Sequence, residues 1–148
     1  MYKHILLPTD GSKLADKAVK QGVALAKSIG AKVTVINVTP EYQMAMDEGF
    51  VLPNSNMLKK RFDDEMAARS KGVLAAAQSK AQAAGVSSNG VVASSGRPYE
   101  AIIRHARKAR CDLIMMASHG RKGLSSILLG SETAKVLTHS TIPVLVVR

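Results

Sequence analysis

Glycine and small hydroxyl side chains gather in one stretch of the chain, "MMASHGRKGLSSILLGSE" (residues 115–132), which begins with an apolar run. Gly120 would allow a bound group to approach the backbone closely. The pair Gly130-Ser131 precedes a helical pattern, and the first amides of a helix attract anions because they lack acceptors within the helix. With the charges of Arg121 and Lys122, this stretch could hold a phosphate.

The same residues also suit a plain surface connection, in which the glycines make tight turns and Ser131 caps the next helix. The stretch is not a Walker A motif, because no glycine is followed by Lys and then Ser or Thr, and it is not a G-x-G-x-x-G fingerprint. His119 could donate a hydrogen bond to a phosphate, but a histidine in a loop is more often a polar turn residue. Residue chemistry alone therefore favours neither an anion site nor a plain connection.

Five segments rich in apolar and β-branched residues predict the strands that must position this stretch. They span residues 4–8, 32–38, 90–94, 112–117 and 142–147. Helical patterns alternate with them over residues 14–29, 58–84, 98–110 and 131–139. Gly30 and Gly85 are expected to end the first two helices, and Ser131 is expected to cap the fourth.

This alternation predicts one α/β domain over residues 1–148: a doubly wound, Rossmann-like sheet of five parallel strands with helices on both faces. In such a sheet, ligands bind beyond the carboxyl ends of the strands, where the order of connections reverses. Residues 8–12 ("PTDGS") and the glycine-rich stretch both follow such ends. The two segments are therefore expected to meet.

The second helix is expected to pack closely on the sheet through an apolar stripe. The stripe consists of Leu58, Phe62, Met66, Val73, Ala77, Ala81 and Ala84. The residues before it, 39–56, contain two prolines and a glycine and show little periodicity, so they predict a loop with at most one helical turn. A loop of this length could cover a site.

The net charge of +10 would attract phosphates, nucleic acids or membrane surfaces. However, Lys and Arg are scattered along the chain instead of forming a basic arm or a basic helix. Aromatic residues make up 3% of the chain and there is no Trp, so few side chains could stack on bases. This pattern argues against a dedicated nucleic-acid-binding protein.

Residues that could bind metals or catalyse reactions form no pattern of their own. Cys111 is the only cysteine, which excludes an internal disulfide and a cysteine-rich zinc site. His4, His105 and His139 lack metal-ligand spacing, so no protein-only metal site is expected. No nucleophile elbow or similar hydrolase motif is found, and no catalytic residue is assigned.

Targeting signals are not expected in this chain. The apolar run near the start is too short for a signal peptide. No stretch approaches the roughly 18 apolar residues of a membrane-spanning helix. We therefore expect a cytoplasmic protein that has no membrane partner.

The chain resembles the universal stress protein family over its full length. The ATP-binding signature of that family is a glycine, two residues, a glycine, nine residues, and then Gly-Ser or Gly-Thr. Here Ala117-Ser118-His119-Gly120 is followed by nine residues and Gly130-Ser131, so alanine stands at the first glycine position. "ILLPTDGS" near the start and "PVLVVR" at the end are also similar to the family.

The resemblance implies a fold like that of the adenine nucleotide alpha hydrolases and a bound adenine nucleotide, ATP with Mg²⁺. It implies that the adenine lies near Val38 and the phosphates along residues 120–132. Asp10 would contact the ribose or a water on Mg²⁺, because a carboxylate repels a bare phosphate. The residues implied in binding are Pro8, Thr9, Asp10, Val38, Ala117, His119, Gly120, Arg121, Gly130, Ser131 and Glu132.

The resemblance further implies a regulatory module for stress survival, with at most slow ATP hydrolysis. It also implies a homodimer that forms through the last strand, Val144 to Val147. Two alternatives stay open: a nucleotide-free interaction protein, favoured by Ala117, and a binder of AMP or cyclic AMP, which some members of the family accommodate. Nucleic-acid binding would rest on net charge alone.

Overall fold

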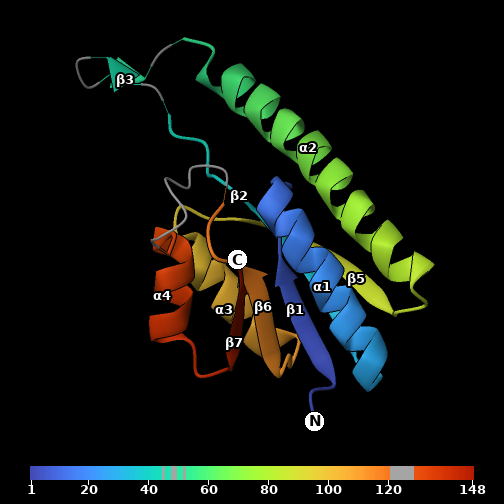
Figure 1. Cartoon of the computed structure of the whole chain (residues 1–148). Helices are drawn as coiled ribbons and strands as arrows, with labels where there is room; N and C mark the ends of the chain where they lie inside the picture. The colour runs from blue at the N-terminus through green and yellow to red at the C-terminus, as the bar shows by residue number, and fades with distance from the viewer. Residues whose placement is uncertain (45, 48–49, 52, 121–128) are drawn as a thin grey trace.

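A parallel sheet of five strands forms the centre of the molecule and lies between two layers of helices (Figure 1). The computed structural model describes residues 1–44, 46–47, 50–51, 53–120 and 129–148. Along the sheet the strands are ordered β5 (Ser88–Ser94), β2 (Lys32–Thr39), β1 (His4–Pro8), β6 (Leu113–Ala117) and β7 (Val144–Val147). Every neighbouring pair in this sheet is parallel, so the predicted doubly wound α/β fold is confirmed.

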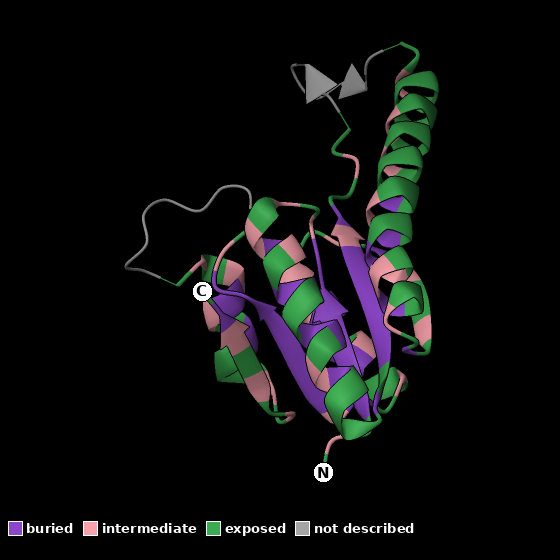
Figure 2. Cartoon of the chain, turned by 45° about the vertical axis from the view of Figure 1, so that its right-hand side comes forward, coloured by how far each residue is buried: buried purple, intermediate pink, exposed green. Residues whose placement is uncertain are grey.

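Two separate cores hold the helices against the sheet. Helices α1 (Lys13–Ile29) and α2 (Ser55–Ala83) cover one face, and α3 (Pro98–Lys108) and α4 (Ser131–His139) cover the other. Because side chains alternate along a strand, β1 sends Ile5 and Leu7 to the first core and Leu6 to the second. Strand β1 is buried along its whole length (Figure 2).

Helix α1 begins and ends where its sequence predicts. The Ser12 hydroxyl caps its start by accepting from the Ala15 amide at 3.2 Å. Gly30 ends it in the left-handed conformation, at φ 68°. Near its middle, Gly22 faces Leu7 of β1, and a Cβ added at Gly22 would lie 2.4 Å from Leu7 Cδ2. A glycine at this position lets α1 lie directly on β1.

The prediction of a loop over residues 39–56 is wrong in two respects. Strand β3 (Met46–Asp47) pairs antiparallel with β4 (Phe50–Val51) in a short hairpin, and α2 begins at Ser55, before the predicted loop ends. Strands of two residues leave no recognisable alternation in a sequence, so periodicity could not reveal this hairpin.

The close packing predicted for all of α2 is also wrong. The buried residues of this helix are Ser70, Leu74, Ala77 and Ala81, whereas Leu58 is 42% exposed. A helix of 29 residues is about 44 Å long. The neighbouring β2, with eight residues, is about 26 Å long. The first half of α2 therefore extends past the end of the sheet (Figures 1 and 2).

Two buried titratable side chains lie near the amino end of the sheet. The His4 ring Nε2 lies 2.8 Å from the Thr34 hydroxyl, and burial, assisted by the charge of Lys32, lowers the pKa of His4. Burial also raises the pKa of the Cys111 thiol to about 11, so this thiol stays protonated at neutral pH.

We predict that Gly22→Ala destabilises the protein although alanine favours helices. The new methyl group would collide with Leu7, which is fully buried, and overpacking of this kind costs about 1–3 kcal/mol. Gly72→Ala is the matched control, because no atom lies within 4 Å of its added Cβ. The control should stabilise α2 by about 0.5–1 kcal/mol. Urea unfolding of both variants checks the prediction, and equal stabilisation by the two substitutions would contradict it.

A second prediction concerns His4 and acid. Because the folded pKa lies below the ordinary 6.5, the unfolded chain binds the proton first, and the free energy of unfolding should fall as the pH drops below about 6.5. Asp112, whose carboxylate accepts from the amides of Lys3 and His4, contributes only at lower pH, below about 3.8. Denaturant unfolding between pH 7 and 5 measures the slope. His4→Gln should flatten it, because the buried ring with the lowered pKa is then absent.

Candidate functional site

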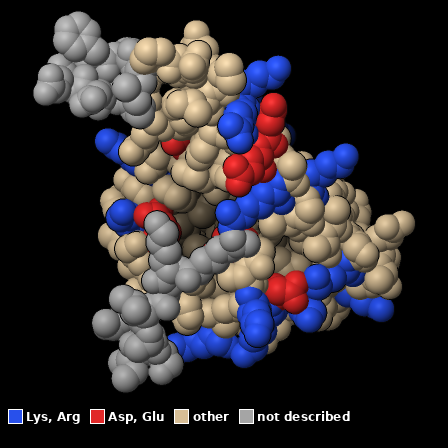
Figure 3. Space-filling view, turned by 90° about the horizontal axis from the view of Figure 1, so that it is seen from above, with Lys and Arg blue, Asp and Glu red and all other residues tan. Residues whose placement is uncertain are grey.

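A cavity of about 430 Å³ opens at the carboxyl end of the sheet. It lies where the chain order reverses, since β1 is followed by β2 on one side and β6 lies on its other side. Seen from above, the surface is hollowed near its centre (Figure 3). The lining residues are Pro8, Thr9, Asp10, Ala15, Ile36, Val38, Pro98, Ile102, Met116, Ala117, His119, Gly120, Gly130, Ser131, Glu132 and Thr133.

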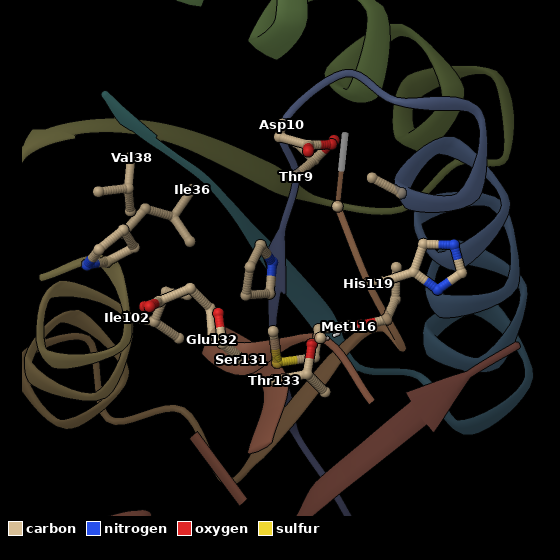
Figure 4. Close-up of a pocket in the computed structure, with 16 residues that line it drawn as sticks. Thr9, Asp10, Ile36, Val38, Ile102, Met116, His119, Ser131, Glu132 and Thr133 are labelled. Carbon is tan, nitrogen blue, oxygen red and sulfur yellow. Dashed lines mark hydrogen bonds between the residues drawn. The ribbon is translucent and has the colours of Figure 1, made fainter. Parts of the chain in front are cut away.

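The turn after β1 forms one wall and is held by its own polar groups. The Thr9 amide donates to the Ile36 carbonyl at 2.9 Å, which extends the β1 ladder by one residue. One oxygen of Asp10 accepts from the Ser12 amide at 2.9 Å, and Gly11 turns the chain at φ 76°. The Asp10 side chain is thereby fixed at the rim of the cavity (Figure 4).

A buried polar chain supports this turn from behind. The side-chain amide nitrogen of Asn37 donates to the Thr9 carbonyl at 2.8 Å, and the Ser70 hydroxyl donates to the Asn37 side-chain oxygen at 2.7 Å. All three residues are buried. Neither Asn37 nor Ser70 was predicted from the sequence, although a polar residue inside an apolar strand is the signal that could have drawn attention to Asn37.

The start of α4 forms the opposite wall. The predicted role of Ser131 as the cap is wrong: Gly130 occupies the cap position, and Ser131 is the first helical residue. The first bond within the helix runs from the Ala134 amide to the Gly130 carbonyl. The amides of residues 131–133 therefore have no acceptor in the helix, and the positive end of its dipole lies at the cavity.

Two glycines bring the walls together, each for a different reason. A Cβ at Gly120 would lie 2.6 Å from Asp10 Oδ2, so a larger residue here would push the Asp10 carboxylate out of its position. A Cβ at Gly130 would lie 3.0 Å from the Cα of His119 and 3.3 Å from the Ser118 carbonyl, to which the Gly130 amide donates. A side chain at Gly130 would thus press on backbone, which yields less than a side chain does.

Apolar side chains line one side of the cavity, with the Glu132 carboxylate beside them. Figure 4 shows Ile36, Val38 and Ile102 on the side opposite His119, with Asp10 at the rim. The Glu132 carboxylate accepts from the Tyr99 amide at 2.8 Å, which holds it at the start of α3. The arrangement suits a ligand with a flat apolar part and an anionic part.

Ala117 lines the cavity, but its methyl group does not lie on the same face of the sheet as the Met116 side chain. Met116 belongs to the core under α3 and α4, and Ala117, the next residue, belongs to the core under α1. The Ala117 carbonyl accepts from the Thr133 hydroxyl at 3.0 Å, which ties β6 to α4. The methyl group is therefore directed to the α1 face, away from the side that Met116 lines.

The structure brings together every predicted site residue that it describes; Arg121 lies outside the described residues. Sequence reasoning missed Ala15, Ile36, Pro98, Ile102, Met116 and Thr133, which are apolar or hydroxyl residues without a chemical signal of their own.

In the described part of the chain, no three His, Cys, Asp or Glu side chains gather as metal ligands. None of the helices formed by described residues has the length and apolar character that crossing a membrane requires.

Comparison with solved structures finds the same fold. The structure of MJ0577 from Methanocaldococcus jannaschii superposes with a TM-score of 0.84 at 29% identity and covers 99% of this chain and 96% of that one. A universal stress protein in complex with cAMP superposes at 0.69 and 22% identity, covering 99% and 97%. One from Archaeoglobus fulgidus in complex with dAMP superposes at 0.70 and 19% identity, covering 99% and 98%.

Comparison of sequences gives the family. The model of the universal stress protein family matches residues 1–148. Universal stress protein YxiE of Bacillus subtilis is 32% identical over 152 residues, which cover all of both chains. Universal stress protein MJ0577 is 31% identical and is matched over 96% of its length. The resemblance drawn from the two loops and the last strand is confirmed, and the chain belongs to the universal stress protein family.

Proposed function

We propose that this protein binds ATP with Mg²⁺ in the cavity between the β1 turn and the start of α4. The observation that carries the proposal is the pairing of an apolar wall with unpaired helix amides across one cavity at the reversal point of the sheet. Adenine fits the first feature and phosphate the second. The fold neighbours in complex with cAMP and dAMP support an adenine nucleotide as the ligand.

The polar side of the cavity supports a role for Mg²⁺. Mg²⁺ in nucleotide sites is commonly held by one carboxylate, water and the phosphates themselves. Asp10 offers such a carboxylate at the rim, close to Gly120. It would either bind a water of the ion or accept from a ribose hydroxyl, since direct contact with a phosphate would be repulsive. The amides of Ser131 and Glu132 would bind phosphate oxygens.

A binding role is favoured over efficient hydrolysis. Phosphoryl transfer needs an oriented water and groups that stabilise the charge of the transition state. The His119 ring Nδ1 lies 3.1 Å from the Ser118 hydroxyl, which couples it to its own loop. We therefore assign no catalytic residue and propose a cytoplasmic regulatory module for stress survival, with at most slow turnover.

The exposed edge of the sheet supports a homodimer. β7 is an edge strand and its Leu145 is 39% exposed. An uncovered β-strand edge offers its backbone groups to a second strand. We propose that Val144 to Val147 of two copies pair in the dimer.

The first test is to purify the protein without added nucleotide, denature it and identify the released nucleotide by chromatography and mass spectrometry. ATP or ADP supports the proposal. AMP or cyclic AMP would favour the alternative that the two ligand-bound neighbours suggest. An empty protein that also fails to bind Mg-ATP in calorimetry would overturn nucleotide binding and leave the interaction protein as the better hypothesis.

Gly130→Val should weaken Mg-ATP binding by about tenfold or more, because its side chain displaces the His119 backbone and with it the amides of α4. Ser131→Ala should have a smaller effect, on the order of a few-fold, since it removes one hydroxyl and leaves the amides at the start of α4 in place. Isothermal titration calorimetry measures both. Gly72→Ala, far from the cavity, is the control and should bind as the wild type does. Unchanged affinity in Gly130→Val would place the ligand elsewhere.

Ala117→Gly should leave Mg-ATP affinity within about threefold of the wild type, because the methyl group lies in the α1 core. The variant should lose about 1 kcal/mol of stability from the added backbone freedom and the lost contact. A gain of affinity of about tenfold would show instead that the methyl group obstructs the nucleotide, as the interaction-protein hypothesis requires.

A further inference from the structure

The first half of α2, residues 55–69, stands apart from the body of the protein, and we call it the arm. No residue of the arm is buried, and the buried residues of α2 begin at Ser70. Figure 2 shows the upper part of this helix as largely exposed, with the sheet ending below it. The arm is therefore a helix whose sides lack the cover that helices in a compact domain have.

One side of the arm carries an apolar row, Leu58, Phe62 and Met66, at intervals of four residues. Two more steps of four lead to Ser70 and Leu74, which are 0% and 8% exposed. Because a step of four residues turns by about 40° around a helix, Met66 lies beside the core-facing side of α2, whereas Leu58 lies about 120° from Ser70. Tyr42 contacts Phe62 with ring centroids 5.5 Å apart, but Leu58 remains 42% exposed. The row is half-buried at Phe62 and Met66 and exposed at Leu58.

Charged residues beside the row are sorted by sign. Lys59, Lys60 and Arg61 form a basic block, and Asp63, Asp64 and Glu65 form an acidic block directly after it. Basic and acidic side chains adjoin on the side of the molecule where α2 lies (Figure 3). The helix dipole does not explain this order, because its effect is confined to the first turn and both blocks lie after it. The Lys59–Asp63 ion pair within the helix also has the less favourable orientation.

The order of the blocks fits a second copy of the same arm. If two arms lie antiparallel with a twofold axis at Phe62, the apolar rows meet, and Lys59 and Arg61 of each arm lie near Asp63 and Glu65 of the other. Lys60 and Asp64 lie about 160° around the helix from Phe62 and face away from the contact. A parallel arrangement would place like charges together. We propose that the arms of two copies pair in this antiparallel manner and form a second contact between chains.

This contact is separate from the β7 edge. α2 lies on the first face, over β2 and β5, and β5 and β7 are the two opposite edges of the sheet. An arm of 15 residues is about 22 Å long, so the contact is smaller than the roughly 1,600 Å² of a standard interface. Association through the arms should therefore depend on protein concentration and weaken with added salt.

The experiment inverts the charge of each block. One variant carries Lys59→Glu, Lys60→Glu and Arg61→Glu, and the other carries Asp63→Lys, Asp64→Lys and Glu65→Lys. Sedimentation velocity over a concentration series should show that each variant alone associates about tenfold or more weakly than the wild type, because its paired arms carry like charges. An equal mixture of the two variants should regain association. Net charge cannot produce this result, since it changes in opposite directions in the two variants.

The matched control inverts three exposed basic residues of α3, Arg104, Arg107 and Lys108, and should associate as the wild type does. If the β7 contact also forms, the arm variants should be dimers where the wild type is a tetramer. If it does not form, they should be monomers where the wild type is a dimer. The proposal would be overturned if the wild type sedimented with the same mass as the two arm variants. It would also be overturned if the mixture of the two variants sedimented with the mass of each variant alone. Should a triple variant lose helical circular dichroism, Phe62→Asp tests the twofold position instead.

Nucleotide binding is measured on the same samples, so the two proposals can fail separately. Arm variants should bind Mg-ATP as the wild type does, since no arm residue lines the cavity. Gly130→Val should associate as the wild type does whether or not it binds nucleotide. Loss of association in Gly130→Val but not in the arm variants would contradict pairing through the arms.

Discussion

Burial of β1 on both faces is the constraint on which the rest of the structure depends. Parallel sheets are covered by helices on both faces, and here β1 has the parallel neighbours β2 and β6. The chain leaves β1 toward one edge of the sheet and later returns to build the other. The gap at this reversal is the cavity, so the position of the site follows from where the first strand lies and not from any residue in the loops.

The loops determine what such a gap can hold. Asp10 and Gly120 come from opposite sides of it and lie so close that a larger residue at position 120 would displace the Asp10 carboxylate. Gly130 serves a different need, because it lets the start of α4 lie against the backbone of residues 118–119. The same signature in a sequence thus combines one glycine that makes room for a side chain and another that makes room for main chain.

Sequence patterns predicted the strands of the main sheet, the four helices and ten of the sixteen residues that line the cavity. Those features depend on local signals: apolar periodicity, turn residues and the family signature. The hairpin of β3 and β4 was missed because two-residue strands have no period. The extension of α2 past the end of the sheet was missed. An apolar stripe in a sequence shows which side of a helix is apolar, but it does not show how far the sheet extends beneath that helix. Asn37 and Ser70 were missed because their pairing joins residues 33 positions apart.

The buried thiol of Cys111 has a consequence for a protein of this family. Peroxides and disulfides react with thiolates, and a cysteine with a pKa of about 11 forms almost none at neutral pH. Cys111 is also the only cysteine in the chain. An oxidative signal therefore finds no thiol switch here, and a disulfide with another thiol does not form while the protein stays folded. Oxidation would instead fall on exposed methionines such as Met44 and Met57.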